Sequence, residues 1–349
     1  MLQEQKDTKN FRAILLVVNA IVLALIGIGY FYMRSEKPTP EQAAETGLTK
    51  VIFNLNWYAQ AELGGFLQAQ EAGYFKDAGL DVEIRQGNAQ LNGPALLVSG
   101  GADFYVGSGF EAVKAVEQGL PVITVAALFQ KDPQVLISHA GVGHDKIEDL
   151  KGKPIMVSAT ATTSFWPFLQ IKFGFTEDQK RPYAFNVAPF LADTKAIQQG
   201  YGTSEPFTIE KSLGKKPNVF YLADYGYLPY ANTIETTVGH VQQKPDMVRK
   251  VVSAVIRGWE SYLQDPTLAF AAIKRLNPEM SEELMKYGFQ QMKTMGLVDS
   301  GDAKKLGIGT MTHARWKAFH QSLVEGKLFP ESLPIEKAYT LDFLPTRAM

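Results

Sequence analysis

The longest uninterrupted hydrophobic stretch lies near the N-terminus. Residues 13–33 (AILLVVNAIVLALIGIGYFYM) contain no charged residue, and this length matches the roughly 20 residues that an α-helix needs to cross a bilayer. Residues 1–12 are polar and hold Lys6, Lys9 and Arg12, which favours a cytoplasmic N-terminus and a body outside the cytoplasm. We therefore predict a cytoplasmic segment over 1–12 and a single transmembrane helix over 13–33. A cleaved signal peptide is the alternative.

After this stretch, segments whose hydrophobic residues recur with the spacing of a β-strand alternate with segments that have the spacing of an α-helix. Residues 34–48 are polar and hold Pro38, Pro40 and Gly47, which predicts a linker. From residue 49 on, short runs of β-branched and aromatic residues alternate with helical patterns, which is typical of an α/β sheet covered by helices. The predicted strands are 51–56, 80–85, 103–106, 122–129, 154–158, 184–188 and 219–223, and the predicted helices are 65–72, 90–99, 111–118, 162–173, 194–199, 245–264, 266–276, 281–293 and 312–325.

Composition narrows the function classes. The chain has 349 residues, which is enough for more than one lobe, and a formal net charge of -1, which argues against nucleic acid as a partner. It has no cysteine, so disulfides, thiolate metal sites, a cysteine nucleophile and a lipidated N-terminal cysteine are excluded. The five histidines lack metal-ligand spacing, and no phosphate-binding loop or G-x-S-x-G elbow occurs. We predict no metal, no cofactor and no catalytic residue.

Several short segments, taken in order, carry a resemblance to a known family. The chain resembles the periplasmic solute-binding proteins of ABC transporters that bind thiamine-pyrimidine precursors, whose wider relatives bind nitrate, sulfonates or riboflavin. The matching segments are 55–66 (LNWYAQAELGGF), 71–82 (EAGYFKDAGLDV), 100–107 (GGADFYVG), 149–153 (DLKGK), 202–207 (GTSEPF), 224–226 (DYG) and 258–259 (GW).

The resemblance implies a type II periplasmic binding protein, with two α/β lobes, a ligand cleft between them and two hinge crossings. Lobe 1 would comprise 49–138 and 237–349 and lobe 2 would comprise 139–236, with crossings near 138–140 and 232–236. Such proteins close on a ligand by hinge motion. The resemblance further implies a monomer that delivers a small molecule to ABC permease and ATPase subunits, with its body on the outer side of the bacterial cytoplasmic membrane.

The candidate site combines four loops that follow predicted strands, because ligands of open α/β sheets bind beyond the carboxyl ends of the strands. In the first loop, Trp57 and Tyr58 can stack on a flat ring, Glu62 can accept hydrogen bonds from an amine, and Gly64 allows close approach. The alternatives are that Trp57 belongs to the core of its lobe and that Glu62 is a solvated residue at a helix start.

The other three loops contribute mainly hydroxyl groups and one carboxylate. Ser108 flanks the second loop, and capping of the following helix is the alternative reading. Thr160, Thr162 and Thr163 form a neutral nest in the third loop, where capping by Thr162 is again possible. The resemblance implies that Glu205 in the fourth loop is the strongest ligand contact of lobe 2. Tyr225 is expected to line one side of the ligand site.

The charges of these loops favour one ligand class. They contain Glu62, Glu111 and Glu205 but no lysine or arginine, whereas an oxyanion site needs cationic donors or a dense amide nest. The sequence therefore predicts a planar, amine-bearing heterocycle such as an aminopyrimidine. Leu63 and Leu67 stand where pyrimidine-precursor binders commonly carry a histidine and an aromatic residue, which leaves room for a different heterocycle.

Three other functions remain open from the sequence. One is a binder of nitrate- or sulfonate-type anions. Another is an enzyme that resembles hydroxymethylpyrimidine synthase, which shares this fold. That enzyme depends on a cysteine-rich segment, and this chain has no cysteine. The third is a membrane-tethered ligand sensor. We predict a non-catalytic binding protein.

Overall fold

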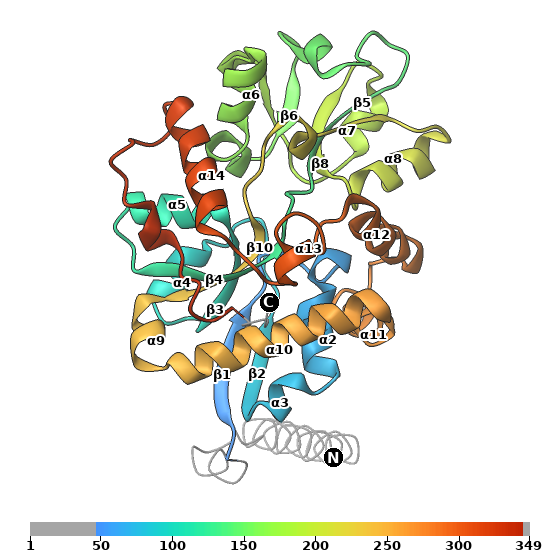
Figure 1. Ribbon diagram of the computed structural model, residues 1–349. Coiled ribbons are helices and arrows are strands. Elements are labelled where there is room, and N and C mark those ends of the chain that lie inside the picture. Colours follow the sequence, from blue (N-terminus) through green and yellow to red (C-terminus); the bar gives the residue numbers. More distant parts are fainter. Residues whose placement is uncertain (1–46, 345–349) are drawn as a thin grey trace, which may run out of the picture. The chain divides into compact units, whose positions relative to one another are not determined.

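Two five-stranded sheets organise residues 47–344, the part of the chain that the computed structural model describes. Each sheet and its covering helices form one lobe (Figure 1). The sheet of lobe 1 has the order β2-β1-β3-β10-β4, and that of lobe 2 has the order β7-β6-β8-β5-β9. The strands are β1 (Thr49–Asn54), β2 (Leu80–Arg85), β3 (Phe104–Ser108), β4 (Val122–Phe129), β5 (Gln134–Ser138), β6 (Ile155–Val157), β7 (Lys180–Pro182), β8 (Ile197–Tyr201), β9 (Asn218–Tyr221) and β10 (Ala231–Thr237). The predicted α/β fold with two sheet-containing lobes is confirmed.

Helices cover both sheets. Lobe 1 carries α2 (Gly64–Glu71), α3 (Tyr74–Asp77), α4 (Gly93–Val98), α5 (Gly109–Glu117), α9 (Val238–Gln243), α10 (Pro245–Gln264), α11 (Thr267–Leu276), α12 (Glu282–Met295), α13 (Ala303–Leu306) and α14 (His313–Glu325). Lobe 2 carries α6 (Trp166–Phe173), α7 (Ala188–Ala192) and α8 (Glu205–Leu213). Single 3-10 turns also occur, of which η2 (Ala61–Leu63), η4 (Thr160–Thr163) and η6 (Leu222–Tyr225) bear on the site.

The crossings between the lobes lie at different residues from those expected. The chain passes from β4 to β5 over residues 130–133 and returns to β10 after η6 over residues 226–230. The expected lobe boundaries assigned β5 to lobe 1, but β5 pairs with β8 and β9 of lobe 2. They assigned most of β10 to lobe 2, but β10 pairs antiparallel with β3 and β4 of lobe 1. Both strands are short runs that contain β-branched residues, and such a run does not reveal which distant sheet it joins.

Two short elements of lobe 2 also differ from the expectation. Residues 194–199 were expected to be helical, whereas β8 occupies Ile197–Tyr201, and the strand expected over 184–188 is replaced by β7 at Lys180–Pro182. The segment Ile197-Gln198-Gln199 has little intrinsic strand preference. It is extended because it pairs with β5 on one side and β6 on the other, so tertiary pairing overrides local propensity.

Glycines set the close packing of α2 on α10. A β-carbon at Gly65 would lie 2.1 Å from the Trp259 ring, and one at Gly258 would lie 2.4 Å from the Gly65 carbonyl oxygen. Trp259 is fully buried in the main hydrophobic cluster of lobe 1. The family-like segment Gly258-Trp259 therefore serves the packing of α10 on α2. This packing holds the start of α2, which directly follows η2.

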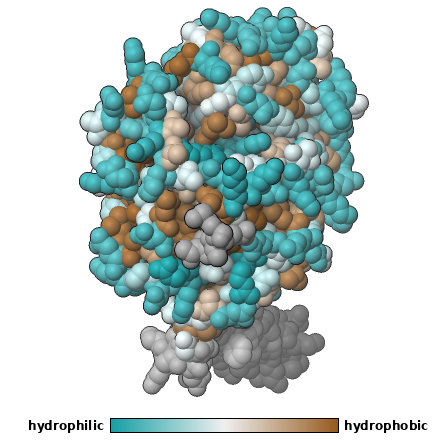
Figure 2. Space-filling model, viewed as in Figure 1, coloured by the Kyte–Doolittle hydropathy of each residue, from teal (hydrophilic) through white to brown (hydrophobic). Residues whose placement is uncertain are grey.

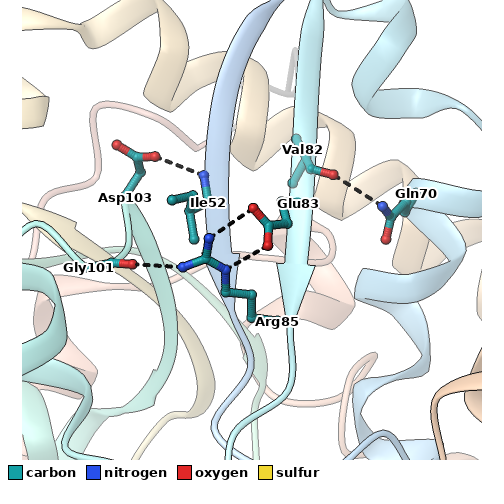
Figure 3. Close-up of polar contacts among 7 residues, drawn as sticks. All are labelled: Ile52, Gln70, Val82, Glu83, Arg85, Gly101 and Asp103. Carbon is teal, nitrogen blue, oxygen red and sulfur yellow. Dashed lines mark hydrogen bonds and ion pairs between the residues drawn. The ribbon is translucent and has the colours of Figure 1, made fainter. Parts of the chain in front are cut away.

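The motif around Asp103 fixes the position of β1 (Figure 3). Asp103 Oδ2 accepts a hydrogen bond from the Ile52 amide at 2.8 Å, and the Asp103 amide donates to the Ile52 carbonyl at 2.9 Å. On the neighbouring strand, Arg85 donates to both carboxylate oxygens of Glu83, at 2.8 and 2.9 Å. These contacts hold the edge of the lobe 1 sheet and orient the loop after β1.

Hydrophilic residues cover most of the face of the molecule shown in Figure 2. Among residues 47–344, no helix combines the length and the apolar character that crossing a membrane requires. The anchor predicted over 13–33 lies outside the described residues.

Candidate functional site

An aromatic contact joins the two lobes at the first loop. The Trp57 ring lies 4.8 Å from the Phe185 ring, centroid to centroid, with an interplanar angle of 51°. Trp57 follows β1 of lobe 1, and Phe185 follows β7 of lobe 2. Phe185 is 44% exposed and has a φ of 55°, a left-handed backbone conformation that a phenylalanine rarely adopts. The structure therefore holds this ring at the lobe junction against the local backbone preference.

Tyr58 and Tyr183 extend this aromatic contact on either side. The Tyr58 ring meets Trp57 edge-on at 5.6 Å, and Tyr58 is 48% exposed. The Tyr183 ring lies 5.3 Å from Phe185, and its hydroxyl donates to Glu205 Oε1 at 3.2 Å. An aromatic row consequently leads from solvent to a buried carboxylate.

Glu62 connects the lobes through its side chain. It lies in η2 of lobe 1, is only 3% exposed, and accepts a hydrogen bond from the Thr203 hydroxyl of lobe 2. Its carbonyl oxygen accepts from Asn232 Nδ2 at 2.7 Å. Burial raises the pKa of Glu62 to about 7 against the opposing effect of the Thr203 hydrogen bond. Glu62 is therefore not a solvated helix-start residue.

Glu205 occupies the start of α8 on the lobe 2 side. Its Oε2 accepts a hydrogen bond from the Tyr201 amide at 2.8 Å, and its Oε1 accepts from Tyr183. Burial raises its pKa, and these hydrogen bonds lower it by less. Glu62 also raises the pKa of the Tyr201 phenol, together with Glu205, so both carboxylates lie within electrostatic reach of Tyr201.

Further buried carboxyl groups face the same phenol. Asp132, in the first crossing segment, is 7% exposed, and burial raises its pKa to about 6. Asp132 and Glu111 both raise the pKa values of Tyr201 and Tyr227, after burial itself. The two tyrosines thus mark the centre of an acidic group contributed by both lobes.

Glu111 forms a coupled pair with Glu235 at the end of β3. Ser108 caps α5, since its Oγ accepts from the Glu111 amide at 3.3 Å, and it donates to Glu111 Oε2 at 3.1 Å. Ser108 therefore caps α5, the alternative to its expected role as a ligand contact, and that ligand contact remains a prediction. Burial raises the pKa of Glu111 to about 7, and burial followed by the Glu111 charge raises that of Glu235 well above its usual value.

A crevice opens where the two lobes meet. Its empty space is about 170 Å³, part of which is open to solvent. The lining residues come from η2, from the loop before α8 and from the start of α12: Gln60, Ala61, Glu62, Thr203, Ser204, Met280 and Leu284. Glu62 is the only residue of this lining with a carboxylate, so the crevice is mildly acidic.

Helices α8 and α12 bring the lobes together beside this crevice. Phe207 of α8 packs on Tyr287 of α12 with ring centroids 5.1 Å apart, and the Tyr287 hydroxyl donates to the Gly202 carbonyl at 3.4 Å. Lys211 forms an ion pair with Glu283 across the same contact. These contacts, which we call the α8–α12 contact, exist only while the lobes are close.

Not every residue expected at the site joins this group. Gly64 faces Tyr262, where a β-carbon would lie 2.2 Å from the ring, so the close approach it permits is between α2 and α10. Tyr225 packs on Phe173 at 5.5 Å within lobe 2, and Glu148 and Asp224 are its charged neighbours. The turn η6 carries Tyr225 away, and Tyr227 lies near Tyr201 instead.

The hydroxyls of the third loop stay near the surface of lobe 2. Thr160 Oγ1 lies 2.9 Å from Ser158 Oγ, and Thr162 Oγ1 accepts from Lys180 Nζ at 3.4 Å. Thr160 and Thr162 are exposed, and the Thr163 side chain is outside the described part of the structure. A role of these threonines in ligand binding remains a prediction.

Sequence reasoning did not find several of the residues that complete the site. Phe185, Tyr183, Tyr201 and Asp132 lie in segments whose secondary structure or lobe the sequence pattern predicted wrongly, whereas Thr203 lies in the expected fourth loop of lobe 2. Thr203 is the exception with a readable signal, because it adjoins the Ser204-Glu205-Pro206 match. Within residues 47–344, no three His, Asp or Glu side chains are grouped as metal ligands would be.

Comparisons with known proteins agree with this architecture. The chain is 24% identical over 314 residues to the riboflavin-binding protein RibY of Chloroflexus aurantiacus, covering 88% of this chain and 89% of RibY. It is 24% identical over 257 residues to the 4-amino-5-hydroxymethyl-2-methylpyrimidine phosphate synthase THI11 of Saccharomyces cerevisiae, covering 69% and 75% of the two chains.

Among solved structures, the periplasmic aliphatic sulphonate binding protein SsuA of Escherichia coli superposes with a TM-score of 0.63 at 11% identity, covering 86% of this chain and 95% of SsuA. This likeness concerns the fold. The model of the family described as NMT1/THI5 like matches residues 60–269, which include both lobes and both crossings. This chain, with its periplasmic-binding-protein fold, therefore belongs to the NMT1/THI5-like family.

Proposed function

We propose that this protein is the substrate-binding component of an ABC importer. It captures a small planar heterocycle, such as an aminopyrimidine, between its lobes and delivers it to the permease and ATPase subunits. It acts as a monomer outside the cytoplasm, tethered by residues 13–33, and catalyses no reaction. The observation that carries the proposal is the Trp57–Phe185 contact between the lobes, near the buried Glu62 and the half-buried Glu205.

The aromatic row supports a flat ligand. Trp57 and Phe185 offer π-faces from opposite lobes, and offset or tilted aromatic arrangements are favourable at centroid separations of about 4.5–7 Å. A planar ring that enters between them replaces their mutual contact by a contact with each face. Closure of the lobes on such a ring follows the hinge motion of binding proteins.

The polar groups support an amine-bearing ligand over an oxyanion. Glu62 and Glu205 can accept hydrogen bonds from an exocyclic amine, and neither pKa is influenced by a lysine or an arginine. An alkylsulfonate or nitrate would have to enter beside these acceptors without a cationic donor. The sulfonate-binding alternative is therefore disfavoured although SsuA shares the fold.

The enzymatic alternative rests on the relatives named as pyrimidine phosphate synthases. RibY, which is matched over more of its length, is named as a binding protein. The chain also has no cysteine, whereas the synthase-like reading implies a cysteine-rich segment.

A thermal-shift screen of the full chain tests the proposal. The panel comprises aminopyrimidines, thiamine, riboflavin, nitrate and alkylsulfonates, because a ligand that binds only the folded state raises the melting temperature. We expect a shift with a planar amine-bearing heterocycle, and recovery of that compound unchanged after incubation. A shift with anions alone, or conversion of the compound, would refute the proposal.

A further inference from the structure

Five carboxyl groups lie near the junction of the lobes, of which Glu62, Asp132 and Glu235 belong to buried residues and Glu111 and Glu205 to half-buried ones. Burial is the largest influence on the pKa of every one of them and raises it. Lobe 1 contributes Glu62, Glu111 and Glu235, the first crossing contributes Asp132, and lobe 2 contributes Glu205. Five ionised carboxylates cannot be buried together without compensating positive charge.

The groups that face these carboxyls are uncharged at neutral pH. They are the phenols of Tyr105, Tyr183, Tyr201, Tyr227 and Tyr262, the hydroxyls of Ser108, Thr203 and Thr233, and the backbone amides of Tyr201 and Gln134. No lysine or arginine contributes to the pKa of any of the five.

The cations of the neighbouring segments are engaged elsewhere. Lys131 Nζ, adjacent to Asp132 in the chain, donates to the Met295 carbonyl at 3.1 Å. The Arg315 guanidinium lies 4.2 Å from the Tyr230 ring centroid and donates to Gln130. Burial lowers the pKa of Arg315, and the carboxylate that raises it in opposition is that of Asp302, which is not one of the five. Among residues 47–344, the group thus has no lysine or arginine as a counter-ion.

One acceptor in this group is incomplete. Glu235 is 0% exposed; its Oε1 accepts from Thr233 Oγ1 at 3.3 Å and the Ser108 backbone amide lowers its pKa, whereas its Oε2 has no hydrogen-bond partner among residues 47–344. The carboxyl group lies against Gly107, where a β-carbon would be 2.3 Å from Glu235 Cδ. A buried carboxylate oxygen without a donor indicates that a proton or a ligand completes it.

We propose that the ligand is a cation, carrying an ammonium group beside the aromatic row, and that its capture displaces protons from the carboxyl groups at the lobe junction to solvent. This inference rests on the proposed function and specifies its ligand. In the empty site protons neutralise the carboxyl groups. When the cation enters, an O–H bond of a carboxyl group breaks, the proton leaves to the buffer, and the cation takes over its compensating charge.

The direction of the pH dependence follows from this exchange. A cation lowers the pKa of the nearby carboxyls, which lie at about 7 for Glu62 and Glu111 and about 6 for Asp132. Binding therefore releases protons between about pH 6 and 7, and the cation binds more tightly as the pH rises through this range. Above about pH 8 Glu62, Glu111 and Asp132 are already ionised in the empty site, so proton release from these three groups stops.

Isothermal titration calorimetry of the full chain tests this with two matched probes. 4-Amino-5-aminomethyl-2-methylpyrimidine carries an ammonium group, and its 5-hydroxymethyl counterpart has the same ring without that charge. Titrations in phosphate and in Tris at pH 6.5 and 8.5 measure proton release, because the two buffers differ in ionisation enthalpy. We expect at least tenfold tighter binding of the aminomethyl compound, with buffer-dependent heat at pH 6.5 and little at pH 8.5.

Two variants separate the charge effect from general damage. Glu235→Gln should reduce the preference for the aminomethyl compound and the buffer-dependent heat at pH 6.5. Glu279→Gln, at an exposed position before α12, should change neither. Equal affinity for both probes, or heat independent of the buffer at pH 6.5, would overturn the cation inference while the proposed function stands. Binding of neither probe, together with no thermal shift from any heterocycle, would refute both.

Discussion

The Trp57 indole of lobe 1 and the Phe185 ring of lobe 2 lie 4.8 Å apart and close the lobe junction on its aromatic side. Phe185 is held in this contact by a left-handed backbone, at a φ of 55°. A strained residue that persists in a fold marks a place where the surroundings overrule local preference, which is frequent at ligand clamps.

Replacing Phe185 should therefore change stability and affinity in opposite directions. Glycine adopts a φ of 55° without strain, so Phe185→Gly should leave the free energy of unfolding unchanged or raise it by up to about 1 kcal/mol. The same change removes one face of the clamp and should weaken ligand binding at least about tenfold. Denaturant unfolding and calorimetry measure the two effects. Loss of both stability and affinity would show that Phe185 serves folding alone.

Glu62 should make the ligand-free protein less stable as the pH rises. Its pKa is about 7 in the folded protein against 4.5 for the unfolded reference, so the folded state binds the extra proton between these values. Its contribution to stability is fully present below pH 4.5 and is lost as the pH rises to about 7, by up to about 3 kcal/mol.

Glu62→Gln should remove this part of the pH dependence. We expect the variant to unfold like the wild type at pH 4.5 and to be more stable than the wild type at pH 8. Urea unfolding at both values measures the difference, with Glu279→Gln as the matched exposed control. A variant that loses the same stability at both values would mean that Glu62 stays ionised when buried.

The α8–α12 contact should favour the closed arrangement mainly through its aromatic pair. Phe207→Ala removes the ring that packs on Tyr287 and should weaken ligand binding by about 5–20-fold, because the closed state becomes less populated. Lys211→Ala removes an ion pair whose partners are both more than half exposed, and should cost less than about threefold. Calorimetry measures both affinities, and equal losses would contradict this ranking.

The tight packing of α2 on α10 should make Gly65 intolerant of a side chain. Gly65→Ala places a β-carbon 2.1 Å from the Trp259 ring and should destabilise the fold by about 1–3 kcal/mol. Gly239→Ala is the control in helix α9, where the nearest atom is 3.6 Å from the added β-carbon. Its free energy of unfolding should be unchanged or slightly higher. Equal stability of the two variants in denaturant would contradict the packing account.

The fold was readable from the sequence where elements are long and regular. The strands at 80–85 and 122–129 and the helix at 245–264 have the predicted bounds, because their hydrophobic periods are sustained. The assignment of β5 and β10 to lobes failed since strand pairing joins residues about 100 positions apart, as Ala231 pairs with Phe129. Local pattern contains no information on such pairing.

The site was readable where a residue type carries its own chemistry. Trp57 and Glu62 were named because aromatic and acidic residues near glycine suggest a binding loop, and Glu205 was named from the family resemblance; the structure places all three near the lobe junction. Phe185 could not be found, since its importance depends on an unusual backbone angle and on a partner in the other lobe. Likewise, a carboxylate such as Glu235 gives no sign in the sequence that it is fully buried.

Tryptophan fluorescence offers the most direct test of ligand capture between the lobes. Of the four tryptophans, Trp166, Trp259 and Trp316 are fully buried, whereas Trp57 lies at the lobe junction. Titration of the full chain with 4-amino-5-aminomethyl-2-methylpyrimidine should give a saturable fluorescence change that is absent in Trp57→Phe, and MOPS, an alkylsulfonate, should give none. A saturable response to MOPS, or an undiminished response to the pyrimidine in Trp57→Phe, would contradict the capture of a planar amine between Trp57 and Phe185.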